Sequence, residues 1–427
     1  MLHGDAVPVD THAGNRRLTV DADTGCLQTS PPGKSCRFQG RRGVLSLWTV
    51  FAMTLVGILT FTVIHLWLYA DTLQRARHCC ESAALAAGYA WLSDDMLRFG
   101  QQSFETDART IRATEAALQI AEFYGGYPTI PRLREDDVQF QWPAPTTLVA
   151  GMALSPESIQ VRFIDAQHTA AAGRPWGTSM ASLDVAASVV LENQPIAFRP
   201  GPGQTVPMLP FALQDQPRRN ADGTVAASGY WTQSIEEGAG ADLVSWDAAS
   251  HQFVTGPDGI PEITVTVSTT GNPDAQEQLI PLEFRQPAAA NLLADDIARG
   301  LRLADLQTLG YSEVGFPTAF PVRSLNAAEL LQADAVLQTL SGRAFVLCLC
   351  TPAAGPSPGP ATSAPIISST ITLTRPVGVR LVDLQRSAPD QFQLRFQPCV
   401  LASALAVTGT DANTPRNRYI YSVRLSE

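Results

Sequence analysis

Few residues in this sequence combine the type and the spacing that catalysis or metal binding requires. No two of the six histidines are four residues apart, and none has a cluster of other ligand side chains beside it, so a zinc site is not expected. They are His3, His12, His65, His78, His168 and His251. We predict no catalytic residue, no cofactor site, no metal site and a protein that is not an enzyme. Because distant residues can converge in a folded chain, an anchored hydrolase stays as a minor alternative.

Three short motifs resemble ligand sites, but local structure explains them better. Gly33–Ser35 would end a phosphate-binding loop only with a glycine five residues upstream, where the sequence has Gln28. The acidic triplet Glu135–Asp137 is typical of a solvated turn. Asn220–Gly223 and Asp258-Gly259 lack the twelve-residue ligand spacing of a calcium loop, and we interpret them as β-turns.

The seven cysteines raise the question of a disulfide. Cys348 and Cys350 lie on one face of a predicted strand, and Cys399 lies on another predicted strand. The candidate pair in an oxidising compartment is Cys350 and Cys399. Small residues of a hydrophobic core are an alternative explanation for the same positions.

The segment that decides the topology is apolar. From Val44 to Tyr69 there are 26 residues without Asp, Glu, Lys or Arg, and a bilayer core needs about 20. Trp48 and Trp67 lie near the ends of this segment, where aromatic rings prefer the headgroup region. We predict a transmembrane helix over residues 44–69. A buried core helix is seldom so uniformly apolar, and the apolar part of a cleaved signal peptide is about half as long.

Charge is distributed unevenly around this helix. Four basic residues precede it closely and two follow it: Lys34, Arg37, Arg41 and Arg42, then Arg75 and Arg77. By the positive-inside rule, the N-terminus is cytoplasmic and the remainder is extracytoplasmic. Residues 1–43 show no hydrophobic period and are predicted to be a flexible cytoplasmic tail. The net charge of −10 argues against binding of nucleic acid.

Residues 70–126 are predicted to form a helical neck. Asp71–Leu97 is rich in alanine and lacks proline, and a second helix of about 20 residues follows from apolar three- and four-residue steps between Phe104 and Ala121. Small side chains on the first helix would let a partner helix approach closely and form an oligomer. The candidate helix-packing interface is Cys80, Ala83, Ala84, Ala87 and Gly88. Packing on the chain's own helix at 104–121 is the alternative.

Beyond Pro128 the apolar period changes from helical to alternating, which indicates half-buried strands of an antiparallel, sandwich-like arrangement. The alternating runs are 158–163, 183–191, 263–267, 391–396 and 419–425. Two helices are predicted at 288–309 and 327–340, the second with capping-box spacing between Asn326 and Glu329. A Pro- and Gly-rich loop or linker at 351–363 separates a β-rich domain (127–350) from a C-terminal β region (364–427). The predicted class is α+β.

The N-terminal third resembles the TadG- and TadE-like proteins of Tad (Flp) pilus assembly. The matching parts are Arg42-Gly43, the long apolar helix, Leu73–Ala76 and Ser82–Gly88, about 50 of the 427 residues. Prepilins of this system have Glu five residues after the cleavage-site glycine, where this sequence has Trp48. The resemblance therefore implies a stationary component and not the filament itself.

What the resemblance implies for function is a non-enzymatic, single-pass protein of the bacterial inner (cytoplasmic) membrane with a periplasmic C-terminal domain. It would act as an envelope scaffold, with other pilus or secretion assembly proteins as partners. The alternative is a membrane-tethered binding or adhesion module that uses exposed loops such as 201–206 or 351–363.

Overall fold

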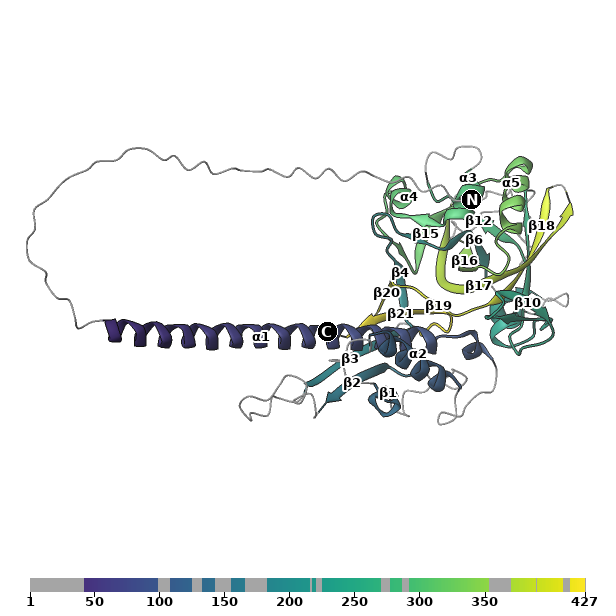
Figure 1. Cartoon of the computed structure of the whole chain (residues 1–427). Coiled ribbons are helices and arrows are strands. Elements are labelled where there is room, and N and C mark those ends of the chain that lie inside the picture. Colours follow the sequence, from purple (N-terminus) through teal and green to yellow (C-terminus); the bar gives the residue numbers. More distant parts are fainter. Residues whose placement is uncertain are drawn as a thin grey trace, which may run out of the picture. The chain divides into compact units, whose positions relative to one another are not determined.

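The computed structural model describes most of the chain beyond residue 41 (Figure 1). The described residues are 42–98, 108–124, 133–142, 155–165, 183–215, 217–219, 225–269, 277–285, 292–352, 370–388, 390–409 and 415–426. The chain divides into two compact units, Met1–Leu66 and Trp67–Glu427. Nearly all of the predicted tail and most of the predicted linker at 351–363 lie outside the described residues.

One long helix, α1 (Arg42–Trp91), supplies every described residue of the first unit and the start of the second. Its 50 residues contain no proline, so no backbone N–H is missing from the hydrogen-bond ladder. The hydroxyls of Thr54, Thr60 and Thr62 donate to carbonyls four residues earlier, each at 2.8 Å. Such bonds satisfy polar groups where water is absent. Among the described helices, α1 alone is long and apolar enough to cross a membrane, which is consistent with a single-pass membrane protein.

In the second unit, the end of α1 and helix α2 (Ala108–Tyr124) pack with a five-stranded sheet (Figure 1). The strand order is β1-β2-β3-β21-β19, and all neighbours are antiparallel except β21 and β19. The strands are β1 (Val138–Gln141), β2 (Ser158–Asp165), β3 (Leu183–Glu192), β19 (Leu401–Ala402) and β21 (Ile420–Leu425). Buried residues of the helices and the sheet form one hydrophobic cluster, here called the neck core.

A larger cluster, here called the main core, surrounds a seven-stranded sheet. Its order is β11-β18-β17-β16-β6-β12, with β15 also on β17. The strands are β6 (Met208–Gln214), β11 (Ile263–Ser268), β12 (Leu279–Pro281), β15 (Thr318–Pro321), β16 (Ala344–Pro352), β17 (Thr370–Ala388) and β18 (Gln391–Pro398). All pairs are antiparallel except β16 with β6. A parallel bridge from Thr266 to Gln278 brings the two edges of the sheet together, so the sheet curls toward closure.

Short elements complete the second unit. The strands are β4 (Pro195–Phe198), β5 (Thr205–Val206), β7 (Pro217–Arg219), β8 (Val225–Gly229), β9 (Val244–Asp247), β10 (Gln252–Thr255), β13 (Leu301–Arg302), β14 (Val314–Gly315) and β20 (Ala406–Thr408). The helical elements are η1 (Asp94–Leu97), η2 (Glu135–Asp137), η4 (Thr232–Glu236), α3 (Leu292–Arg299), α4 (Leu303–Thr308) and α5 (Ala327–Gln338).

Of the two helices predicted from the sequence, one is present and the other is divided into two. The capping box of α5 is confirmed, because the Asn326 side chain accepts from the Glu329 N–H and the Glu329 carboxylate accepts from the Asn326 N–H. A single helix over 288–309 is wrong for the residues described there, since α3 and α4 are separated by Gly300 and β13. Gly300 has φ +76°, and a Cβ there would lie 2.2 Å from the Val206 carbonyl oxygen, so the chain must turn at this glycine.

A long apolar helix followed by mainly β structure in several, mostly antiparallel sheets is confirmed. The sandwich arrangement and the domain boundaries at 126/127 and 350/351 stay predictions. Strand β21 lies between the two cores. Ile420 packs in the main core, whereas Tyr421 and Val423 pack in the neck core, because successive side chains of a strand point to opposite faces.

Candidate functional site

The most extensive unusual surface is the apolar surface of α1 from Leu47 to Tyr69. Every large hydrophobic side chain in this stretch is exposed, from 38 % for Tyr69 to 77 % for Met53. Apolar surface in water is unfavourable by about 25 cal/mol per Å², and continuous patches of this extent are rare on soluble proteins. Hydrocarbon removes that penalty. This stretch can therefore act as a membrane anchor.

The small side chains predicted to contact a partner helix lie inside the neck core. Four of the five predicted residues are completely buried: Cys80, Ala83, Ala84 and Ala87. A Cβ at Gly88 would lie 3.0 Å from Val189 Cγ1 and 3.1 Å from Val423 Cγ1. The sheet of the same chain therefore occupies this face. Ala113, Ala117 and Ala121 of α2 lie in the same neck core, whereas no sheet against this face was predicted from the sequence.

The two cysteines of the candidate disulfide are free thiols in the structure. Cys350 pairs with Leu373 of β17, while the Cys399 N–H donates to the Gly378 carbonyl from the β18 side of β17. Two strand spacings, about 9.6 Å, separate them, which exceeds the Cα separation that a disulfide spans. Burial raises the pKa of Cys350 to about 12, so this thiol stays protonated and unreactive.

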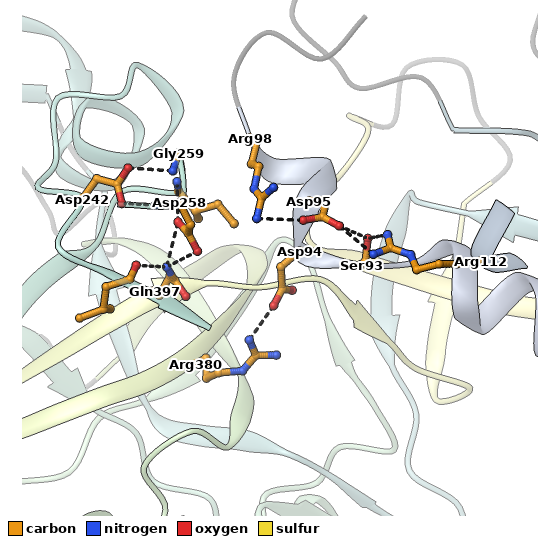
Figure 2. Close-up of polar contacts among 12 residues, drawn as sticks. Ser93, Asp94, Asp95, Arg98, Arg112, Asp242, Asp258, Gly259, Arg380 and Gln397 are labelled. Carbon is orange, nitrogen blue, oxygen red and sulfur yellow. Dashed lines mark hydrogen bonds and ion pairs between the residues drawn. The ribbon is translucent and has the colours of Figure 1, made fainter. Parts of the chain in front are cut away.

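A polar cluster joins the neck core to the main core at η1 (Figure 2). The Asp94 carboxylate accepts hydrogen bonds from the Val400 N–H at 2.7 Å and from Arg380 Nη1 at 2.6 Å. The Arg380 guanidinium also lies over the ring of Trp246, 4.1 Å from its centroid. We call Asp94, Arg380 and Val400 the neck joint. It fixes the segment after α1 to strand β17 and to the residues that follow β18.

Side chains around the neck joint extend this network to α2. Asp95 binds Arg98 at 3.1 Å and Arg112 of α2 at 3.0 Å, and Figure 2 shows both guanidinium groups directed at its carboxylate. The side chains of Asp95, Arg98 and Arg112 are more exposed to solvent than those of Asp94 and Arg380. Water therefore screens the Asp95 pairs more strongly.

On the other side of the joint, a loop before β11 contains closely spaced carboxylates. Asp242 accepts from the N–H groups of Asp258 and Gly259, at 3.0 and 2.8 Å. Asp258 in turn accepts from the Gln397 amide (Figure 2). Burial raises the pKa of Asp258, and it also raises the pKa of Glu262, which accepts from the Val244 N–H. These acids organise the loop backbone, and Asp258 also accepts locally from the Ile260 N–H at 2.9 Å.

Among the remaining sequence motifs, only the acidic triplet lies within the described residues. Glu135–Asp137 forms η2, where the Asp137 carboxylate accepts from the Arg134 N–H at 2.8 Å. Asn220–Gly223 lies outside the described residues. In the part of the chain that the structure describes, no group of three or more His, Cys, Asp or Glu side chains could hold a metal ion. The neck joint had no signal in the sequence, because Asp94 belongs to no motif.

The fold and these surfaces define a class: a β-rich protein whose described residues include one helix that can span a membrane. Comparison with protein-family models, with curated proteins and with solved structures finds no match to this chain.

Proposed function

We propose that this chain is a non-enzymatic, single-pass scaffold of the bacterial inner membrane that supports pilus or secretion assembly. The observation that carries the proposal is the exposed apolar surface of α1 from Leu47 to Tyr69. The resemblance of Arg42-Gly43, Leu73–Ala76 and Ser82–Gly88 to Tad assembly proteins supports the assembly role. The proposed topology has a cytoplasmic N-terminus and a periplasmic second unit, because more basic residues precede the apolar stretch than follow it.

The surface available to assembly partners differs from the one expected from the sequence. Since Cys80–Gly88 faces the neck core, an oligomer or partner contact through this part of α1 must use its exposed side. Tyr89 lies on that side and is 47 % exposed, whereas Leu73, which is 39 % exposed, lies before the neck core in line with the buried Ala76 and Cys80. Aromatic and aliphatic side chains at such positions are suitable anchors for a partner helix.

Site-specific photo-crosslinking in the native membrane tests the proposal. A photoreactive residue is placed in the full-length chain at Leu73, Tyr89, Gln204 or Leu331. Gln204 lies in an exposed turn, and Leu331 is an exposed control on α5. We expect Leu73 and Tyr89 to capture membrane proteins of an assembly machine, and Leu331 to capture none of them.

The same experiment distinguishes the adhesion alternative. Capture of a cell-surface or soluble target at Gln204, without membrane partners at Leu73 and Tyr89, would favour a tethered adhesion module. Recovery of the intact chain in the aqueous fraction after cell breakage would overturn the membrane-anchor proposal itself.

A further inference from the structure

The region around α3 has an unusual concentration of buried charge. Asp296 is 2 % exposed, and it lies on the same helix as Leu293 and Ile297, which pack in the main core. The neighbouring helix α4 buries Asp305, and α5 buries Glu329. Buried carboxylates persist only where guanidinium groups or other donors compensate them.

Asp296 shares its arginine partner with Asp295. The Nη2 atom of Arg285 lies 2.8 Å from the Asp296 carboxylate and 2.7 Å from that of Asp295. Asp295 has a second partner, Arg299, at 2.7 Å. Among the described residues, Asp295 has two ion-pair partners and Asp296 has one. The negative charge of Asp296 is therefore less compensated than that of Asp295.

Two other carboxylates near Asp296 are paired, and the Arg343 guanidinium contacts the Ala298 carbonyl of α3 at 3.5 Å. Asp305 binds Arg302 at 2.9 Å, and Glu329 pairs with Arg323. Strand β6, which also packs on α3, has no ionisable side chain. The charged groups that act on Asp296 are therefore Arg285, Asp305, Arg323 and Asp295. Burial raises the pKa of Asp296 to about 6, with Asp305 and Asp295 adding to the increase and the two arginines opposing it.

We propose that α3 is a pH-responsive cap on the main core, which loosens when Asp296 releases its proton as the pH rises from mildly acidic to neutral. Protonated Asp296 is a neutral, buried hydrogen-bonding group that leaves Arg285 to Asp295. Ionised Asp296 is a buried carboxylate that shares Arg285 with Asp295, and local opening of α3 exposes it to water.

The sign and size of the effect follow from linkage. The pKa of Asp296 is higher in the closed cap than in an opened, solvated one, so the stabilisation is complete at low pH and is lost as pH rises through about 6. With an open-state pKa of about 4, the local opening equilibrium should increase about tenfold between pH 5 and pH 8. This inference is independent of the proposed function. The proposed periplasmic location of the second unit matters only for one point, which is whether the pH outside the cytoplasm acts on Asp296.

Hydrogen exchange of the full-length protein in detergent tests it, with rates corrected for intrinsic base catalysis. We expect protection of Leu292–Arg299 to fall about tenfold from pH 5 to pH 8, with peptides from β17 unchanged. Asp296→Asn should abolish this pH dependence. Asp295→Asn, which leaves Arg285 to Asp296 and removes a neighbouring negative charge, should weaken this pH dependence without abolishing it.

Two results would overturn the proposal. One is wild-type protection of α3 that is equal at pH 5 and pH 8, a measurement that requires no variant. The other is a folded Asp296→Asn protein with the wild-type pH slope.

Discussion

At the scale of single residues, Asp94 joins parts of the chain that are far apart in sequence. Its carboxylate binds Arg380, 286 residues away, and the Val400 N–H, 306 residues away. Asp94 and Arg380 are both largely buried, so each depends on the other for compensation. The neck joint is therefore a specific connection between the two cores.

Replacing Asp94 tests this connection. We expect Asp94→Ala to lower the free energy of unfolding by about 1–3 kcal/mol, because it leaves the buried Arg380 guanidinium and the Val400 N–H without an acceptor. Urea unfolding in detergent measures the change. The control is Asp95→Ala, whose partners are more exposed and whose cost should be below about 1 kcal/mol. Equal losses for the two variants would contradict a special role for Asp94.

Residue-level features were predictable only where the partners are neighbours in sequence. The capping box of Asn326 and Glu329 was predicted, since both its bonds span three residues. The neck joint was not, because nothing in the sequence around Asp94 identifies an arginine nearly three hundred residues later as its partner. The same limit applies to Cys350 and Cys399: alternation predicts strands, but it does not predict that β17 lies between them.

At the scale of elements, the small residues of α1 serve the protein's own packing. Alanine and glycine let the helix approach β3 and β21 closely. The uncharged apolar run and its alanine-rich continuation predicted this helix, and alternating apolar residues predicted the strands β2, β3, β11, β18 and β21. They did not predict which helix face meets which sheet, because a face of small residues fits a helix or a sheet equally well.

Enlarging this face tests the assignment. Ala84→Leu should destabilise the second unit by about 1–3 kcal/mol, because the neck core has no space for the added atoms. Limited proteolysis and thermal unfolding measure the loss, and Tyr89→Leu on the exposed side is the matched control. If Ala84→Leu left stability unchanged but dissociated membrane complexes, the result would support the helix-packing interface expected from the sequence.

The apolar stretch of α1 permits a second test at this scale. The double variant Leu55→Asp/Leu59→Asp places two carboxylates in the middle of the stretch, at a cost of about 5–7 kcal/mol for membrane insertion. We expect alkaline extraction to release this variant from membranes and to leave Leu55→Ile/Leu59→Ile bound. Release of both variants, or of neither, would argue against hydrocarbon as the solvent of this stretch.

At the scale of the whole molecule, the two cores of the second unit share one strand. β21 contributes Ile420 to the main core and Tyr421 and Val423 to the neck core. Residues from both ends of the unit therefore build the neck core. A linear sequence shows composition changes, whereas the shared core arises from pairing of β21 with β3.

This arrangement predicts coupled unfolding. Tyr421→Ala should lower stability by about 3–5 kcal/mol, by analogy with truncation of buried aromatic side chains. Hydrogen exchange should report the loss in α2 and in β17 alike. Leu425→Ala, at the exposed end of the same strand, should change neither region. A loss confined to α2 would mean that the cores unfold independently.

The division of side chains at η1 has a consequence for how the protein can vary. Met96 belongs to the neck core and Leu97 to the main core, so the border between the two apolar interiors crosses a single peptide bond. A spacer between domains tolerates added residues, but here one inserted or deleted residue would send each side chain toward the wrong interior. Changes in chain length should therefore be excluded at this point.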